Sequence, residues 1–245
     1  MFKSKWSPIL AWISFASLAV GFIFLMYSIK NGPQAKGIPE ILRNGLERNE
    51  RIARKLPVQR LVEFPKSAAN LKPRANGKYG LKTKLDSIGF RLRVIHPVTG
   101  DTVAFTTDQI KALHKTEVVF DFKCIEGWNQ ITWWGGLRFS TFIRKFYPEL
   151  LDEEGNLLYD YVGLMTPDKG YYVGLDAESM MMDQTLLSYE VSGHELPLEH
   201  GYPLRLIIPI KYGIKHIKRI GYLYFSNQKP KDYWAERGYD YNAGH

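Results

Sequence analysis

The chain has 245 residues, of which 45% are hydrophobic and 24% are charged, a composition typical of a globular protein. This composition excludes wholesale disorder, a collagen-like chain and a membrane protein with many spans. The single cysteine, Cys124, excludes an intrachain disulfide framework, a zinc site built from several cysteines and an iron–sulfur cluster held by four thiolates.

The net charge of +8 is unevenly distributed along the chain. Residues 30–93 contain 16 Lys and Arg against 5 Asp and Glu, whereas residues 94–245 contain 15 against 20. An excess of positive charge often indicates nucleic-acid binding. Here the basic segment directly follows an apolar one, which indicates a membrane surface and predicts no nucleic-acid partner.

Residues 9–29 are a run of 21 side chains without a charge. At about 1.5 Å per residue, such a helix can cross a hydrocarbon core of about 30 Å. The alternative is a cleaved signal peptide, whose apolar run is about 7–15 residues long and ends in small residues. We therefore expect residues 1–30 to be a membrane anchor that contacts lipid through residues 9–29. The flanking positive charges are equal in number on both sides, so the positive-inside rule does not assign the membrane face.

Residues 31–72 are expected to form a basic juxtamembrane helix and linker. Apolar residues recur through residues 38–56 at the spacing of one helical face, which predicts an amphipathic helix. This helix either lies near the membrane or serves as a solvated spacer. Pro, Gly, Asn and Lys are frequent in residues 57–80, which predicts irregular structure there.

Residues 73–245 are expected to form the globular domain. Alternating or continuous apolar patterns predict strands over residues 90–94, 102–105, 117–124, 159–165, 203–210 and 220–225. Helices are predicted over residues 107–114 and 136–147, the second stopped by Pro148. Strands outnumber helices and follow no regular βαβ alternation, so the predicted fold class is α+β and strand-rich.

Common enzyme motifs do not occur in this sequence. It contains no GxSxG, no Walker A motif and no GxGxxG. His194-Glu195 begins like HExxH, but the next histidine is His200 and Pro197 would break the helix, so no zinc-protease site is expected. On spacing alone, Cys124 is either a buried core thiol or the nucleophile of a cysteine enzyme with a distant histidine, His200 or His216, as its base.

Two segments carry the chemistry, CIEGWNQITWWGG (124–136) and EHGYPLRLIIPIKYGIKHIKRIGYLYF (199–225). The first places a thiol at a strand end beside a carboxylate, tryptophans and glycines. The second is a strand followed by a cationic loop with Lys211, Lys215, His216, Lys218 and Arg219. Together with His200 and Arg205, this loop suits a phosphate or another anion. A solvated basic hairpin would have the same composition.

Together with GLDAESMMMDQTLLSYEVSGHELPLEHGYPLR (174–205), these segments resemble the molybdopterin domain of the sulfite oxidase family, from about Pro73 to the C-terminus. The resemblance implies a mixed, strand-rich sulfite-oxidase-type fold and a molybdenum–molybdopterin cofactor. It also implies that Cys124 is the thiolate ligand of molybdenum, which fits the preference of soft thiolates for such metals. One cysteine suffices because the pterin dithiolene supplies the other sulfurs.

The resemblance also implies contacts to the cofactor, with His200 and Arg205 at its pterin–phosphate end. The residues expected to bind the cofactor are Asn76, Tyr79, Gly80, Thr166, His200, Arg205, His216, Ile217 and Lys218. The catalytic residues expected are Cys124 and Tyr172, with a hydroxyl from Tyr171 or Tyr172 near a bound oxo group. Glu126 is expected to support the metal ligand, and Trp128, Trp133 and Trp134 either wall the pocket or belong to the core.

Sulfite oxidases carry Asn-Arg shortly after the cysteine and a further C-terminal dimerisation domain. Here Cys124 is followed by Ile-Glu-Gly-Trp-Asn-Gln and the sequence ends at His245. Both features resemble the bacterial protein-methionine-sulfoxide reductase catalytic subunit branch of the family, although Lys3-Ser4-Lys5 stands where that branch usually has a twin-arginine signal.

This branch implies two-electron reduction of a sulfoxide or a similar S- or N-oxide. It also implies a haem-containing membrane electron-transfer partner, a monomeric catalytic domain and a periplasmic face. The alternatives are a sulfite-oxidising enzyme and a non-catalytic, membrane-tethered binding module with the same fold.

Overall fold

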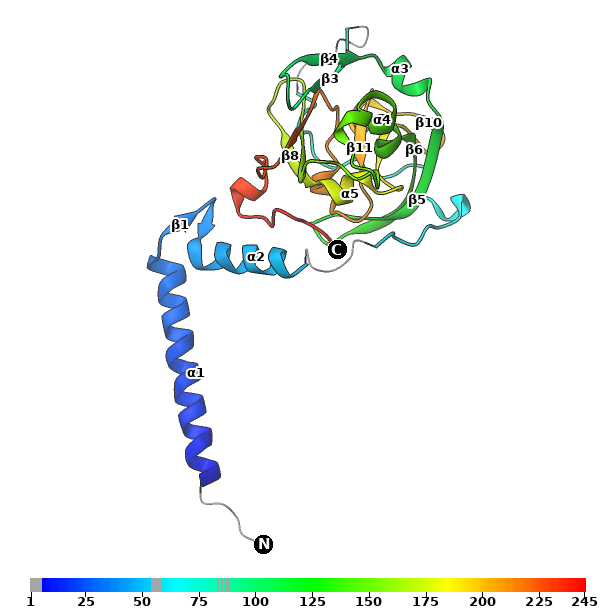
Figure 1. Cartoon of the computed structure of the whole chain (residues 1–245). Coiled ribbons are helices and arrows are strands. Elements are labelled where there is room, and N and C mark those ends of the chain that lie inside the picture. Colours follow the sequence, from blue (N-terminus) through cyan, green and yellow to red (C-terminus); the bar gives the residue numbers. More distant parts are fainter. Residues whose placement is uncertain (1–5, 54–58, 83, 85, 87–88) are drawn as a thin grey trace. The chain divides into compact units, whose positions relative to one another are not determined.

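The computed structural model describes residues 6–53, 59–82, 84, 86 and 89–245 (Figure 1). The chain divides into two compact units. The first comprises Met1–Leu56 with Glu236–Asp240, and the second comprises Pro57–Ala235 with Tyr241–His245.

Within the described residues, α-helices and strands alternate irregularly along the chain. The α-helices are α1 (Trp6–Asn31), α2 (Glu40–Ala53), α3 (Thr107–Lys111), α4 (Phe139–Phe146) and α5 (Ala177–Met181). The strands are β1 (Gln34–Ala35), β2 (Ile38–Pro39), β3 (Leu92–Ile95), β4 (Thr102–Phe105), β5 (Lys115–Lys123), β6 (Asn129–Arg138), β7 (Tyr161–Met165), β8 (Tyr172–Asp176), β9 (Leu186–Val191), β10 (His194–Glu195), β11 (Arg205–Ile207) and β12 (Tyr222–Ser226). Short 3-10 helices cover Lys66–Ala68, Pro148–Leu150, Leu198–His200, Gly213–Lys215 and Ala235–Arg237.

The first unit begins with the apolar helix predicted from the sequence. Within Pro8–Asn31, the most apolar part of this helix has a mean hydropathy of 2.3, and none of its residues is buried. By length and composition this helix can cross a membrane, although a signal sequence near an N-terminus has the same properties. A two-stranded hairpin of β1 and β2 follows, and then α2, which confirms the helix predicted within residues 38–56 but begins at Glu40.

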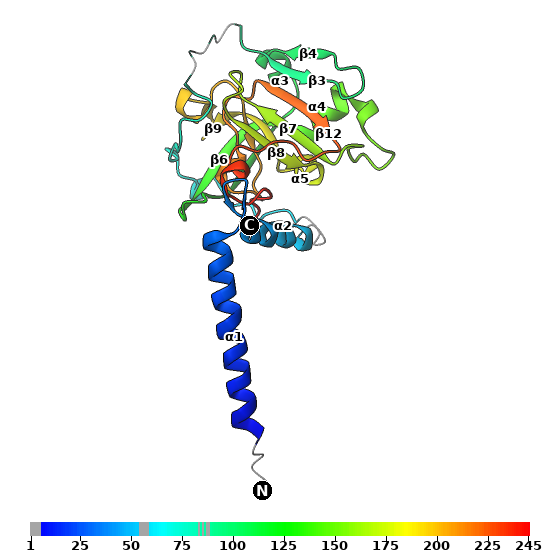
Figure 2. The ribbon, with the colours of Figure 1, turned by 90° about the vertical axis from the view of Figure 1, so that its left-hand side faces the viewer.

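The second unit contains two five-stranded sheets. One has the order β10-β9-β6-β5, with β11 also paired to β9, and every pair in it is antiparallel. The other has the order β4-β3-β12-β7-β8. In it β12 lies between β3 and β7, parallel to β3 and antiparallel to β7 (Figure 2). The predicted α+β, strand-rich class is confirmed.

The core of this unit takes apolar side chains from both sheets and from α4. The larger cluster includes Leu92 of β3, Leu164 of β7 and Leu137 of β6, all fully buried. A second cluster contains Trp134, Leu186 and Ile207, which alternate with residues of the larger cluster along β6, β9 and β11. The β5–β6–β9 sheet is therefore apolar on both faces.

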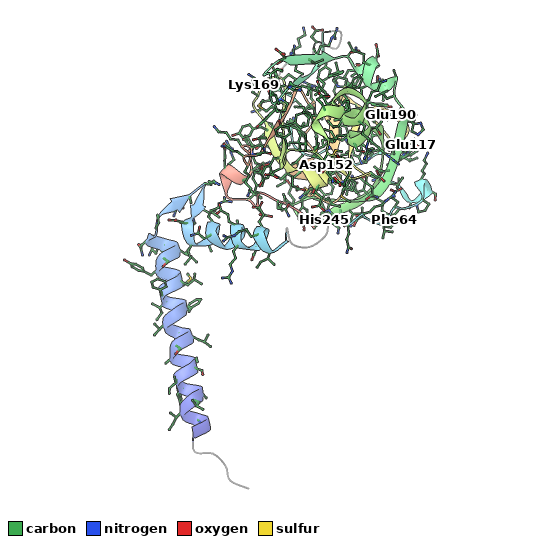
Figure 3. The ribbon with its side chains drawn as sticks, viewed as in Figure 1. Phe64, Glu117, Asp152, Lys169, Glu190 and His245 are labelled. Carbon is green, nitrogen blue, oxygen red and sulfur yellow. The ribbon has the colours of Figure 1, made fainter. Side chains whose placement is uncertain are left out.

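Charged side chains also lie on one face of the same sheet, where Glu117 of β5 and Glu190 of β9 flank Gly135 of β6. Lys115 lies between Glu190 (2.8 Å) and Glu117 (3.7 Å), and Lys66 approaches Glu117 at 2.5 Å. Figure 3 shows Glu117 and Glu190 near one another. These exposed pairs give modest stability.

Two sequence predictions about element bounds are wrong. The helix expected over residues 136–147 begins at Phe139, because β6 continues to Arg138. A Cβ added to Gly136 would lie 2.4 Å from the carbonyl oxygen of Leu187, so this glycine allows β6 to approach β9 closely. The strand expected over residues 203–210 is limited to Arg205–Ile207, the residues that pair with β9.

Candidate active site

Cys124 begins the tight turn that joins β5 to β6. Its backbone N–H donates to the carbonyl oxygen of Trp128 (2.9 Å), and Gly127 N–H donates to the carbonyl oxygen of Cys124 (3.0 Å). Gly127 has φ +88°, a conformation that glycine adopts without steric cost. The Cys124 side chain is a free thiol and only 7% exposed. The turn therefore holds the sulfur in a defined position.

Asn76 reaches this thiol from a segment 48 residues earlier in the chain. Its Nδ2 lies 3.7 Å from Cys124 Sγ, within hydrogen-bonding distance for sulfur. A hydrogen bond from Asn76 and another from Trp128 Nε1 (3.1 Å) lower the pKa of Glu126, and the nearby Arg74 adds to this shift. An ionised carboxylate thus shares the Asn76 amide with the thiol.

Lys218 connects Asn76 to a group of buried cations. Its Nζ donates to the carbonyl oxygens of Asn76 (2.7 Å) and Gly77 (3.0 Å). Burial and, to a smaller extent, the Arg205 charge lower the pKa of Lys218 to about 7, against an opposing effect of Glu199. The pKa of this amine therefore lies close to neutral pH, and a bound anion would favour its protonated, charged form.

Arg205, in β11, is a buried cation without a carboxylate partner among the described residues. Its Nη atoms donate to the carbonyl oxygens of His200 (3.0 Å) and His216 (3.1 Å), and its guanidinium carbon lies 4.5 Å from the centre of the Trp134 ring. Nε is buried with no hydrogen-bond partner in the described part of the chain. Burial lowers the Arg205 pKa to about 9. A buried cation of this kind is costly unless an anion neutralises it.

Both histidines of the predicted site are neutral at pH 7. Burial, with a smaller contribution from Arg205, lowers the pKa of His200 to about 4 and that of His216 to about 3. His216 Nε2 lies 3.0 Å from the carbonyl oxygen of Lys211, and Phe122 packs on the ring at 4.8 Å between centroids. These histidines offer hydrogen-bonding groups and not positive charge.

The lysines of the predicted cationic loop have two kinds of surroundings in the structure. Lys215 Nζ lies 2.5 Å from Asp232 Oδ2 with both side chains almost fully buried, and Lys211 Nζ lies 2.8 Å from Asp176 Oδ2. These two lysines form ion pairs within the fold. Lys218 instead donates to backbone carbonyls and faces the Arg205 charge.

Residues 79 and 80 join the same assembly. Gly80 has φ +74°, and a Cβ there would lie 2.2 Å from Thr166 Cγ2 and 3.4 Å from the Lys218 carbonyl oxygen. Thr166 is fully buried and its Oγ1 accepts the Tyr171 backbone N–H (3.1 Å). The ring of Tyr79 stacks on that of Tyr171 with centroids 5.6 Å apart. Segment 76–80 thus contacts Cys124, Thr166 and Lys218.

Tyr172 and Ile217 have different surroundings. Tyr172 pairs with Met165 across the β7–β8 ladder, and its ring lies 5.9 Å from that of Tyr233. Ile217 is fully buried, and its carbonyl oxygen accepts the Leu206 N–H (3.0 Å). The catalytic role predicted for Tyr172 and the cofactor contact predicted for Ile217 stay predictions.

Gly201 belongs to this site and was missed in the sequence analysis. It has φ +104°, and a Cβ there would lie 2.8 Å from the Lys218 Cβ. The glycine therefore lets the turn after His200 pack directly on Lys218. The sequence signal was available, because Gly201 immediately follows His200 in the segment HGYPLR.

A pocket of about 930 Å³ opens next to these residues. Gly77, Lys78, Glu199, Tyr202 and Arg219 contribute to its wall. Its volume lies in the range of small-molecule sites, about 300–1,000 Å³. The segments that line it are the ones that carry Asn76, His200 and Lys218.

Comparison with known proteins identifies the family. The family model described as "Oxidoreductase molybdopterin binding domain" matches residues 80–234. This match covers more than half of the chain, and the chain belongs to this molybdopterin-binding oxidoreductase family. The predicted family and cofactor type are confirmed.

Curated relatives extend this result. The chain is 35% identical over 161 residues to a protein of Azospira oryzae named, provisionally, as protein-methionine-sulfoxide reductase subunit YedZ1, and the match covers 66% of this chain and 58% of that protein. It is 30% identical over 137 residues to the protein-methionine-sulfoxide reductase catalytic subunit MsrP of Xanthomonas campestris, covering 52% and 42%. It is 24% identical over 178 residues to mitochondrial sulfite oxidase of Mus musculus, covering 63% and 32%. The chain thus spans about half the length, or less, of most of these relatives.

A solved structure supports the fold. The sulfane dehydrogenase SoxCD of Paracoccus pantotrophus matches with a TM-score of 0.51 and 17% identity, over 60% of this chain and 40% of that chain. At this identity the likeness bears on the fold alone. It agrees with the predicted sulfite-oxidase-type architecture.

The residues of the site fit a molybdopterin cofactor at both of its ends. Cys124 provides a soft thiol suited to molybdenum. Arg205, with a buried Nε that lacks a partner in the described chain, and the half-buried Lys218 provide donors suited to a phosphate. Asn76 connects the two, since it contacts Cys124 through its side chain and Lys218 through its backbone.

Proposed function

We propose that this protein is a membrane-anchored molybdenum-cofactor oxidoreductase that reduces a sulfoxide, such as methionine sulfoxide, by two-electron oxygen-atom transfer. The observation that carries the proposal is that Asn76 contacts both Cys124 and Lys218, and that the Arg205 charge acts on Lys218. The names of two curated relatives, both protein-methionine-sulfoxide reductase subunits, support the substrate class.

Each residue of the site has a distinct task in this proposal. When bound, the cofactor supplies two-electron oxygen-atom transfer. Cys124 holds the metal, and Asn76 donates to the sulfur and so orients it. Lys218 and Arg205 neutralise the phosphate end, while the turn at Gly201 keeps Lys218 in place. Tyr172 is proposed to offer a hydroxyl to the oxygen that is transferred.

Glu126 favours a sulfoxide over sulfite as the substrate. Its carboxylate is fully exposed, its pKa is lowered, and it binds the same amide as Cys124. Negative charge near the metal ligand repels sulfite but not a neutral sulfoxide. The sequence between Cys124 and Arg138 contains no arginine, although the Arg74 charge acts on Glu126 from an earlier segment.

The remaining parts of the proposal concern organisation. Residues 1–30 act as the anchor, residues 31–72 as the juxtamembrane helix and linker, and residues 73–245 as a monomeric oxidoreductase domain. The domain works on the periplasmic face and receives electrons from a haem-containing membrane partner. The apolar, unburied helix α1 supports the anchor. The names of the bacterial relatives, which call each a subunit of a reductase, support a partner protein.

The experiment is to purify the full chain in detergent and to measure molybdenum per chain together with turnover. With reduced viologen as the electron donor, methionine sulfoxide should be consumed at a rate proportional to the bound molybdenum. Oxidation of sulfite with an artificial acceptor should be much slower. A chain that binds no molybdenum would support the alternative of a non-catalytic binding module. Faster oxidation of sulfite than reduction of methionine sulfoxide would support the alternative of a sulfite-oxidising enzyme.

A further inference from the structure

Helix α2 buries a cation and exposes apolar side chains, the reverse of a helix that packs on a soluble core. Arg43 is 4% exposed, and its guanidinium donates to the carbonyl oxygens of Lys36 (3.0 Å) and Tyr239 (3.2 Å). Ile41, Leu42 and Ile52 are 36%, 41% and 56% exposed. A surface helix normally turns its apolar stripe inward and its charges toward water.

The packing of the first unit maintains this orientation. A Cβ on Gly37 would lie 3.1 Å from the backbone of Arg237, and one on Gly238 would lie 2.6 Å from Ile38 Cγ2. Both glycines have positive φ, at +81° and +98°. The hairpin and residues 236–240 are thus packed tightly together, and Arg43 is bonded to both. Rotation of α2 about its axis would break these bonds and leave a buried guanidinium without acceptors.

The outward face has the pattern of a helix that lies in a membrane interface. Ile41, Gly45 and Ile52 follow one another at four and seven residues, so they share one face, and Leu42 lies beside them. The surroundings of Gly45 are open. Arg48 and Arg51, both exposed, border this stripe. An apolar stripe with a basic edge partitions into the boundary between headgroups and acyl chains, most strongly where the lipids are anionic.

We infer that α2 lies on the surface of an anionic bilayer, with Ile41, Leu42 and Ile52 in the headgroup–acyl boundary and Arg48 and Arg51 among the phosphates. Residues 31–56 carry six Lys and Arg against three Glu, which complements such a surface. This inference rests on the proposed function in one respect, that α1 spans the membrane. Only residues 32–39 separate the two helices, and α2 runs crosswise to α1 in both views (Figures 1 and 2).

A fluorescent reporter on the full chain tests this. In a Cys124→Ser background, an NBD dye is attached to Ile52→Cys on the apolar stripe or to Glu47→Cys. The Glu47 side chain is 46% exposed, and at about 100° per residue it lies roughly 140° around α2 from Ile52. Both proteins are reconstituted in vesicles of phosphatidylcholine with roughly 30% phosphatidylglycerol. The dye at 52 should brighten at least about twofold and be quenched by lipids spin-labelled near the headgroup, whereas the dye at 47 should stay in water.

A second variant tests the basic edge. Arg48→Gln with Arg51→Gln should shift the dye at 52 back toward water, by about fivefold in partitioning per arginine removed. Pure phosphatidylcholine vesicles should have the same effect on the parent protein. Equal signals in neutral and anionic vesicles would overturn the anionic-lipid assignment.

The outcomes separate this inference from the anchor. Vesicle flotation with equal, water-like signals at 52 and 47 would overturn the inference and leave the α1 anchor intact. Absence of flotation would overturn the anchor and the inference together. A dye at 52 that is shielded from water but not quenched by spin-labelled lipid would mean that protein covers the stripe, which also overturns the inference.

Discussion

The side-chain amide of Asn76 lies 3.7 Å from the Sγ of Cys124, although 48 residues separate them in the chain. The backbone carbonyl of the same asparagine accepts from Lys218 Nζ at 2.7 Å. One residue thus joins the proposed metal ligand to the proposed phosphate-binding cations. The predictions below test both ends of this connection.

Cys124→Ser should abolish sulfoxide reduction while the protein stays folded. A neutral hydroxyl is a poor replacement for a soft thiolate, and the side chain keeps nearly the same size in its buried turn. The measurements are turnover, molybdenum content and the melting temperature of the cofactor-free protein. Full activity in the variant would show that Cys124 is not a ligand of the metal and would support its interpretation as a buried core residue.

Arg205→Ala should lower cofactor occupancy and leave the rate per bound molybdenum nearly unchanged. Loss of a charge-assisted hydrogen bond, about 1.5–3 kcal/mol, corresponds to an affinity about ten- to hundredfold weaker. Arg144→Ala, at an exposed position on α4, is the matched control. Unchanged occupancy with a collapsed rate per metal would assign Arg205 to the substrate instead.

Lys218 should make the cofactor-free protein more stable as the pH rises above 7. Its pKa is about 7 in the fold and 10.5 ordinarily, so between these values the unfolded chain holds a proton that the folded chain lacks. The free energy of unfolding then rises with pH, by at most about 1.4 kcal/mol per pH unit. Urea unfolding at pH 7 and pH 9 measures this rise. Lys218→Met should remove it, and an identical rise in the variant would contradict the assignment.

Asp232→Ala should destabilise the fold strongly because it leaves Lys215 buried and unpaired. Lys215 Nζ lies 2.5 Å from Asp232 Oδ2, and the two side chains are 1% and 2% exposed. Breaking one partner of such a pair costs about 3–5 kcal/mol. Glu195→Gln, which breaks the exposed pair with Lys111, should cost less than about 1 kcal/mol. Denaturant unfolding of both variants measures the two losses in the free energy of unfolding. Equal losses would contradict the claim that the buried pair matters more than the exposed one.

Glu126→Gln should improve the use of sulfite relative to methionine sulfoxide. The change removes a negative charge close to the thiol but keeps a side chain that can bind Asn76. We expect the KM for sulfite, or its inhibition constant if it is not oxidised, to fall several-fold at low ionic strength, and high salt should reduce this effect. The KM for the neutral sulfoxide should change little. A parallel change in both constants would indicate that Glu126 acts by positioning Asn76 and not by charge.

Part of the site could be predicted from the sequence because it depends on local patterns. The alternation before Cys124 predicts a strand that ends at the thiol, and β5 ends at Lys123. The segments around Cys124 and Arg205 were sufficient to identify the family, which the comparison confirms. The apolar run of residues 9–29 likewise predicts α1 without any tertiary information.

The charge state of the basic loop could not be predicted in this way. The sequence alone does not distinguish between Lys211, Lys215 and Lys218. In the structure, Asp176 and Asp232 form ion pairs with the first two. Those carboxylates come from distant parts of the chain, so only folding decides which lysine remains available to an anion. Burial then lowers the pKa of Lys218, which again depends on neighbours and not on local sequence.

The amphipathic pattern of residues 38–56 by itself determined that a helix forms there, because backbone hydrogen bonds within a helix are local. It did not determine which face is outward. The bonds from Arg43 to Lys36 and Tyr239 decided that, since a buried guanidinium must keep its acceptors. Likewise the glycines at 135–136 did not reveal that β6 extends to Arg138, because the pairing that extends it lies in β9, some fifty residues further along the chain.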